Sequence, residues 1–160
     1  MKYFKIKRRY NLRDFLIYTA GIIDSLIIEN NLKEATEWRC ELKQKLGRYL
    51  NNLHISIYDP TICLLERLSH CSKQSVADQN TYYLRKADLL VVNVHNVLKS
   101  PGTLAEIDYF YREGKPRVGF CMEENDKLIL QNRTYPIVML TDIFSNLDEV
   151  IRYIEVCFYV

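Results

Sequence analysis

The stretch from Ser100 to Glu106, which reads Ser-Pro-Gly-Thr-Leu-Ala-Glu, brings together several residue types that could do chemistry. Ser100 and the first free N–H groups of a helix that begins here would form an anion site, suited to a phosphate or a sugar hydroxyl. Gly102 would let a ligand approach the backbone closely, because it has no side chain. Glu106 in the first helical turn would lie in the positive field of the helix dipole, which keeps a carboxylate ionised, as a nucleophile must be.

The same residues also fit a purely structural role. Thr103 and Glu106 are three residues apart at the start of a predicted helix, which is the pattern of a capping box. In such a box, Thr103 accepts a hydrogen bond from the backbone N–H of Glu106, and the Glu106 side chain reaches back. Spacing alone favours this interpretation, and composition alone does not choose between a helix cap and a nucleophile.

Short apolar runs alternate with longer amphipathic segments along the chain, and these predict the elements that position the stretch. Strands are expected over 15–20, 54–58, 89–94, 117–121 and 135–140, and helices over 33–50, 74–86, 103–112 and 147–158. The run 89–94 is apolar on both faces, which suits a central parallel strand that is covered on both sides. This rhythm predicts an α/β sandwich with a mostly parallel sheet of about five strands.

In an open parallel sheet, ligands bind beyond the carboxyl ends of the strands. Gly21 directly follows the first predicted strand, and Asp59 directly follows the second. The turn that leads to Glu106 follows the central strand. We therefore expect Gly21, Asp59 and Glu106 to meet at one edge of the sheet.

Six motifs follow one another along the chain: Ile17-Tyr-Thr-Ala-Gly21, Trp38-Arg39, Asp59-Pro60, Ala87-Asp-Leu-Leu-Val-Val-Asn93, Ser100-Pro-Gly-Thr-Leu-Ala-Glu-Ile107 and Gly114-Lys-Pro116. In this order they resemble the motifs of the nucleoside 2-deoxyribosyltransferase superfamily, which includes nucleoside 5′-monophosphate N-glycosidases. Each piece is weak alone, but together, in order and at family-like spacing over residues 15 to 120, they make a specific signal. The sequence thus resembles this superfamily.

The resemblance implies a flavodoxin-like or Rossmann-like three-layer fold and a mechanism. In the family, the helix glutamate attacks the anomeric carbon of the sugar and displaces the base, which leaves a covalent glycosyl-enzyme. Water then hydrolyses this intermediate, or a second base accepts the sugar. Glu106 matches the nucleophile, and no cofactor or metal is needed, since a carboxylate and positioned donors suffice.

Ser100 favours a nucleotide as the substrate. Transferases in the family that act on free nucleosides often have Asp six residues before the glutamate, whereas members that act on 5′-monophosphates tend to have Ser. A neutral hydroxyl suits a dianionic phosphate better than a carboxylate would. The alternative is that Ser100 merely starts the turn.

Asn80 is a departure from the family's pattern. The family often has Asp eight residues ahead of the aspartate that corresponds to Asp88, where it helps to protonate the leaving base. Asn80 stands at that position and cannot donate a proton. Asp78 lies two residues earlier, on a different side of the predicted helix. Either Asp78 takes the role through a shifted helix, or the protonation step is weakened, which puts catalytic competence in doubt.

For the other candidate residues, a structural explanation stands beside the functional one. Tyr18 could line the base pocket or pack in the core, and Asp24 could contact the base or be an ordinary exposed aspartate. Asp88 is interpreted as structural, because it lies where a helix meets a strand. No metal-ligand spacing with cysteines is found for the three histidines, His54, His70 and His95.

The chain of 160 residues has a formal net charge of +2, so its overall charge gives no support to a nucleic-acid partner. Residues 1–14 form a basic N-terminal arm that could touch phosphate but is better interpreted as solvated, and residues 15–160 are predicted to form the deoxyribosyltransferase-like domain. The five cysteines include no CxxC pair, and no secretory leader is recognised, so free thiols in the cytoplasm are expected. The apolar segment 15–28 is too short and too polar to span a bilayer.

Three functions remain open at this point: a 5′-nucleotide N-hydrolase, a deoxyribosyltransferase, and a catalytically silent nucleotide-binding domain. Ser100 supports the first, the overall pattern the second, and Asn80 the third. Members of the family assemble as dimers or larger oligomers in which a neighbouring chain often completes the site. Residues 123–136 are the candidate for that contribution here.

Overall fold

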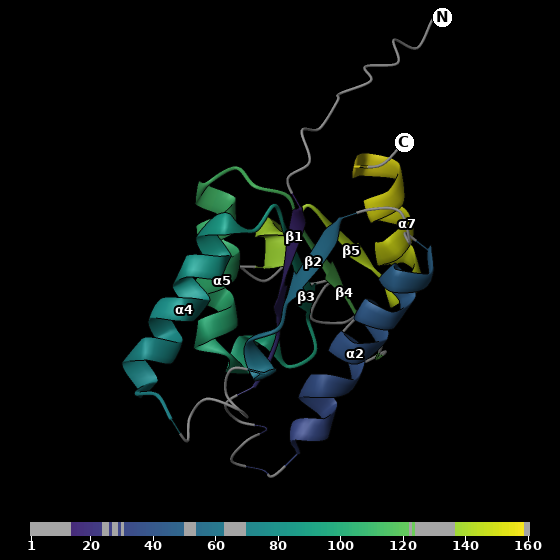
Figure 1. The fold of residues 1–160 in the computed structure, drawn as a ribbon. Coiled ribbons are helices and arrows are strands. Elements are labelled where there is room, and N and C mark those ends of the chain that lie inside the picture. The colour runs from purple at the N-terminus through teal and green to yellow at the C-terminus, as the bar shows by residue number, and fades with distance from the viewer. Residues whose placement is uncertain are drawn as a thin grey trace, which may run out of the picture.

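In the computed structural model, five parallel strands form one sheet in the order β2-β1-β3-β4-β5 (Figure 1). The structure describes residues 14–23, 26, 29, 31–49, 54–62, 70–121, 123 and 137–158. The strands are β1 (Phe15–Ala20), β2 (Ile55–Tyr58), β3 (Leu89–Asn93), β4 (Arg117–Phe120) and β5 (Asp142–Phe144). The helices are α2 (Leu32–Tyr49), α4 (Lys73–Lys86), α5 (Pro101–Arg112) and α7 (Leu147–Phe158), with 3-10 turns η1 (Val97–Lys99) and η2 (Ile137–Met139).

Helices α4 and α5 cover one face of the sheet, and α2 and α7 cover the other, so the described residues form three layers (Figure 1). Alternate residues of β3 explain why. Leu90 and Val92 pack with residues of α4 and α5 in one hydrophobic cluster, whereas Leu89 and Val91 pack with residues of α2 and α7 in another. All four side chains are fully buried, as expected for a strand that is apolar on both faces.

The strand order is that of flavodoxin-like folds, and the expected α/β class is confirmed. In this topology the chain reverses its direction of winding between β1 and β3. The crevice beyond the carboxyl ends of these two strands is therefore where a ligand is expected. The Ser100–Glu106 segment lies there, because η1 and α5 follow β3 directly.

The last strand differs from the expectation over 135–140, which is wrong. Ile137–Met139 form a 3-10 turn, and the fifth strand is Asp142–Phe144, which pairs with β4. Ile137 and Met139 are buried while Val138 is 51% exposed, so the apolar alternation that suggested a strand arises in a turn. The side chain of Arg117 donates a hydrogen bond to the carbonyl oxygen of Met139. In a strand, a neighbouring strand would provide the hydrogen bond to this oxygen.

Several expectations fall on residues outside the described ranges. One is Asp24. The others are the basic arm, of which only Asp14 is described, and the segment 123–136, of which only Glu123 is described. No helix in the described part of the chain has the length and apolarity to cross a membrane.

Candidate active site at the carboxyl ends of β1 and β3

An open pocket lies beyond the ends of β1 and β3 and gathers most of the residues singled out in the sequence. It is lined by Thr19, Ala20, Gly21, Ile23, Pro60, Asn80, Ser100, Gly102, Thr103 and Glu106. Tyr18 and Asp59 are not lining residues, but each contacts the pocket wall from behind, as described below. The expected meeting of the glycine turn, the second strand end and the helix glutamate is therefore observed.

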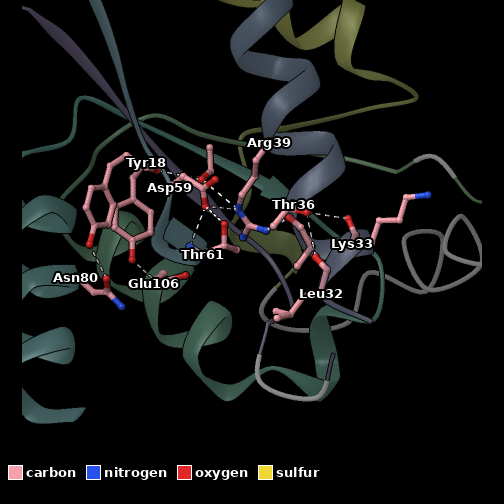
Figure 2. Close-up of polar contacts among 12 residues, drawn as sticks. Tyr18, Leu32, Lys33, Thr36, Arg39, Asp59, Thr61, Asn80 and Glu106 are labelled. Atoms are coloured by element: carbon pink, nitrogen blue, oxygen red, sulfur yellow. Dashed lines mark hydrogen bonds and ion pairs between the residues drawn. The ribbon is translucent and has the colours of Figure 1, made fainter. Parts of the chain in front are cut away.

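Glu106 is held by Tyr18. The hydroxyl of Tyr18 donates a hydrogen bond of 2.7 Å to Oε1 of Glu106, and the Tyr18 side chain is fully buried on β1 (Figure 2). Burial, and next the negative charge of Glu106, raise the pKa of Tyr18 far above its ordinary value, so the hydroxyl stays protonated and remains a donor. A charge-assisted bond of this kind orients the carboxylate and stabilises its ionised form.

The cap of α5 is Ser100, not Thr103, and this contradicts the capping-box interpretation. The Ser100 hydroxyl accepts from the backbone N–H of Thr103, and it also lies 2.9 Å from the Thr103 hydroxyl. Pro101 is the first helical residue, so Glu106 lies in the second turn. The expectation that Glu106 lies in the first-turn field of the helix is therefore wrong, and the side chain is instead hydrogen-bonded to the hydroxyl of Tyr18.

Gly21 is closely surrounded by neighbouring atoms, whereas Gly102 is not. A Cβ atom at Gly21 would lie 3.3 Å from Cβ of Asn93, so the first glycine turn packs tightly against β3. A Cβ atom at Gly102 would meet no atom within 4 Å, because the residue faces the open pocket. Gly102 thus leaves room for a ligand at the beginning of α5, as the sequence suggested.

Asn80 reaches the pocket from α4, but Asp78 does not. Oδ1 of Asn80 accepts a hydrogen bond of 2.7 Å from the hydroxyl of Tyr58. Asp78 is exposed and accepts a bond from the side chain of Gln74, one turn earlier on the same helix. The two positions are about 200° apart around a helix, so α4 cannot present both to the pocket.

A buried arginine supports the pocket from α2. Nε of Arg39 lies 3.4 Å from Oδ1 of Asp59 and donates to the Thr19 hydroxyl at 3.2 Å (Figure 2). Asp59 also accepts from the backbone N–H and hydroxyl of Thr61, which folds the turn that places Pro60 in the pocket wall. Burial lowers the pKa of Arg39 to about 10, against the opposing effects of Asp59 and Glu106, so the guanidinium remains charged at neutral pH.

Sequence reasoning did not assign roles to Arg39 and Tyr58. Arg39 was present only as part of a matched motif, and its terminal Nη2 is buried without a hydrogen-bond partner. Tyr58 was only the last residue of a predicted strand. A buried cation beside a strand end is invisible in the sequence, because α2 and β2 meet through tertiary contacts.

Asp88 and His95 are not among the residues that line the pocket. Asp88 accepts a hydrogen bond from the backbone N–H of Leu16 at 2.9 Å, which supports its structural interpretation. The ring of His95 lies 3.4 Å from Glu34 and 3.6 Å from Glu123. Within the described ranges, no group of three or more His, Cys, Asp or Glu residues could hold a metal ion.

The topology and the pocket define a flavodoxin-like α/β domain that carries a buried-tyrosine and carboxylate pair at its switch point. No protein-family model and no curated protein matches the sequence. Among solved structures, the chain is similar to a conserved protein from Enterococcus faecalis V583, with a TM-score of 0.61 and 18% identity, over 91% of this chain and 100% of that chain. It is also similar to a 2-deoxyribosyltransferase from Bacillus psychrosaccharolyticus, with a TM-score of 0.59 and 20% identity, over 86% of this chain and 91% of that chain.

These similarities confirm, at the level of the fold, the resemblance that the sequence motifs suggested. The likeness extends over nearly the whole length of both solved chains, so it concerns the complete sheet and its helices rather than one shared motif.

Proposed function

We propose that this protein cleaves the N-glycosidic bond of a nucleoside or nucleoside 5′-monophosphate, with Glu106 as the nucleophile. The observation that carries the proposal is the Glu106 carboxylate, which lines an open pocket while the buried Tyr18 hydroxyl holds one of its oxygens at 2.7 Å. A carboxylate used only as a structural partner has no need of an open pocket beside it. The solved 2-deoxyribosyltransferase with the same fold supports this class of reaction.

The reaction proceeds through a covalent intermediate. A carboxylate oxygen of Glu106 forms a bond to the anomeric carbon, and the bond from that carbon to the base nitrogen breaks with its electron pair going to the base. The transition state resembles an oxocarbenium ion, so the negative charge of Glu106 stabilises it. Water then attacks the glycosyl ester and releases the sugar, or a second base accepts the sugar.

The beginning of α5 favours a 5′-monophosphate over a free nucleoside. Ser100, Gly102 and Thr103 line the pocket at the N-terminus of a helix of 12 residues, where the helix dipole favours an anion. The Ser100 hydroxyl is neutral, so it does not repel a phosphate as an aspartate at this position would. We therefore propose hydrolysis of a nucleotide as the first candidate.

Base exchange is the second candidate, and the fold shared with the solved 2-deoxyribosyltransferase favours it. Incubating the purified protein with nucleosides and 5′-monophosphates, with and without a free acceptor base, separates the two. Release of base without an acceptor indicates hydrolysis, whereas turnover that requires an acceptor indicates transfer. Binding without any turnover would identify a silent nucleotide-binding domain.

Glu106→Ala tests the nucleophile. We expect kcat/KM to fall by at least about 1,000-fold, because the covalent step is lost. Mass spectrometry of the wild-type protein, digested after a rapid quench of the reaction, is expected to show a glycosyl adduct on the peptide that contains Glu106. Ser72→Ala, on the exposed cap of α4, is the control for handling and folding. Full turnover by Glu106→Ala would contradict the mechanism.

The protein is further proposed to act in the cytoplasm as a homodimer or larger homo-oligomer. Tyr82 on α4 and Tyr111 on α5 are each 51% exposed, which leaves aromatic surface for a second copy. Light scattering coupled to size-exclusion chromatography measures the mass in solution. A monomer at concentrations that support full activity would contradict this proposal.

A further inference from the structure

Two tyrosines that stand side by side in the sheet each hold one side chain of the pocket. Tyr18 and Tyr58 are direct partners in the register of β1 and β2, and their rings lie 5.3 Å apart. Tyr18 donates to the carboxylate of Glu106, and Tyr58 donates to Oδ1 of Asn80. The sheet therefore positions the nucleophile and the amide as a matched pair on the same face.

The bond from Tyr58 decides which end of the Asn80 amide faces the pocket. A primary amide has one acceptor oxygen and two N–H donors. Because the oxygen is directed at Tyr58, the nitrogen of Asn80 points away from that bond, as its blue tip shows in Figure 2. Asn80 also lines the pocket, and with its oxygen engaged by Tyr58 its N–H donors are the groups left to bond a ligand there.

Packing keeps this orientation in place. The Tyr58 ring stacks on Tyr83 with centroids 4.1 Å apart and an interplanar angle of 17°, and only 8% of Tyr58 is exposed. A ring confined on both sides cannot swing its hydroxyl away from Asn80 without breaking the stack. The donor face of the amide is thus preorganised before a ligand arrives.

We propose that Asn80 donates a hydrogen bond to the departing base, and that the substrate class is therefore one whose base leaves as an anion. This inference rests on the proposed function, because it concerns the base that Glu106 displaces. Among the described residues that line the pocket, Glu106 is the one carboxylate, and it is the nucleophile. Asn80 offers no proton to transfer, so stabilisation of the leaving base falls to its N–H donors.

The balance of the step is complete without an acid. The bond between the anomeric carbon and the base nitrogen breaks, its electron pair stays on the base, and an oxygen of Glu106 forms the new bond to carbon. The base departs as an anion, and one of its acceptor atoms receives a hydrogen bond from the Asn80 amide. The base takes a proton from water afterwards. Bases with a ring carbonyl beside the glycosylated nitrogen suit this route. The carbonyl oxygen shares the negative charge of the departing base and accepts the hydrogen bond from the Asn80 amide.

Leaving-group dependence tests the inference. The substrates are a series of uracil nucleosides and 5′-monophosphates, unsubstituted and 5-halogenated, whose bases differ in N–H acidity. We expect kcat/KM of the wild type to rise with the acidity of the base and to show no loss that reports ionisation of a general acid between about pH 6 and pH 8. A rate that is indifferent to base acidity would overturn the inference.

Tyr58→Phe and Tyr83→Phe form a matched pair of variants. Tyr58→Phe keeps the stack but releases the Asn80 amide, whereas Tyr83→Phe removes a hydroxyl from the same stack and leaves the bond to Asn80 in place. We expect Tyr58→Phe to lower kcat about 10-fold for the poorest leaving bases, with less effect on the best ones and little on KM. Tyr83→Phe is expected to behave as wild type, and equal behaviour of the two variants would contradict the positioning role.

Asn80→Asp adds an acid at the same place. It is expected to flatten the dependence on base acidity and to introduce a loss of rate as pH rises, because a protonated carboxyl can protonate the base directly. An unchanged dependence would overturn the role of Asn80. Thermal melts of each variant confirm that the fold is retained.

A measurement that needs no turnover separates this inference from the proposed function. In ¹⁵N-labelled protein, the side-chain amide protons of Asn80 are expected to shift when free uracil is added, and the shift is expected to shrink in Tyr58→Phe. If the shift occurs without cleavage of any substrate, the proposed function fails while the donor role stands. If Glu106-dependent cleavage occurs but the amide signals do not move, the donor role is overturned and the proposed function stands.

Discussion

At the scale of single residues, the pocket depends on hydroxyl groups that sit beneath it. Tyr18 is fully buried and has a strongly raised pKa, and its bond to Glu106 joins β1 to α5. The same bond contributes to catalysis and to stability, since it both orients a carboxylate and satisfies a buried hydroxyl. The two contributions can be separated by their dependence on pH.

Tyr18 is expected to lower the free energy of unfolding as pH rises above about 10. Its hydroxyl ionises near the ordinary value of 10.0 in the unfolded chain but not in the folded one, so the contribution is complete below that pH and is lost above it. Arg39 has the opposite effect on stability. Its pKa is lowered by burial, so the folded protein loses this buried positive charge at a lower pH than the unfolded chain does. Urea unfolding between pH 8 and pH 11 measures the sum.

Tyr18→Phe isolates the tyrosine in that experiment. The variant keeps the ring and Arg39 but removes the ionisable group, so its stability should decline less between pH 10 and pH 11 than that of the wild type. Parallel pH profiles for the two proteins would contradict the assignment. The same variant is expected to lower kcat, because one oxygen of Glu106 loses its donor.

At the scale of elements, the beginnings of helices provide the clearest test. Ser100 caps α5 inside the pocket, and Ser72 caps α4 in an exposed position by accepting from the backbone N–H of Ser75. Ser100→Ala and Ser72→Ala are each expected to cost about 1 kcal/mol of unfolding free energy, because each leaves an N–H group without its cap. Chemical denaturation measures both losses.

The two cap variants should differ in substrate preference. With Ser100→Ala, kcat/KM is expected to fall more for a 5′-monophosphate than for the matching nucleoside, since the hydroxyl lies at the proposed phosphate position. Ser72→Ala should leave that ratio unchanged. Equal ratios in both variants would show that Ser100 is a cap and nothing more, which was the alternative drawn from its sequence.

At the scale of the whole molecule, the sheet and its covering segments pack without spare room at β4. A Cβ atom at Gly119 would lie 2.8 Å from Cδ1 of Leu140 and 2.9 Å from Cγ1 of Val94. Gly119→Ala is therefore expected to destabilise the fold by about 1–3 kcal/mol, since side chains from two segments must move. Gly47→Ala on α2 is the control, because nothing lies within 4 Å of its added Cβ atom.

The control should change stability in the other direction. Gly47 lies inside a helix, where alanine is more favourable than glycine by about 0.5–1 kcal/mol. Thermal melts of the two variants, compared with wild type, give the sign of each effect. A stable Gly119→Ala protein would mean that the layer over β4 yields more easily than its contacts imply.

Much of the fold followed from the amino-acid sequence because the determining signals are local. Apolar runs such as 89–94 predict buried strands, and amphipathic segments predict the helices that cover them. The expected last strand over 135–140 failed for a related reason. Alternation over a few residues is shared by strands and tight turns, and only the pairing of β5 with β4 distinguishes them.

Sequence patterns were sufficient for the α/β class and, through the ordered motifs, for Glu106 as the candidate nucleophile. The Ser100 cap, the outward position of Asp78, and the bonds from Tyr18 and Tyr58 to pocket side chains became visible only in the folded chain. The bonds from the two tyrosines join segments that are far apart in the chain. Strand register and helix rotation are set by packing across the whole sheet, which no local pattern contains.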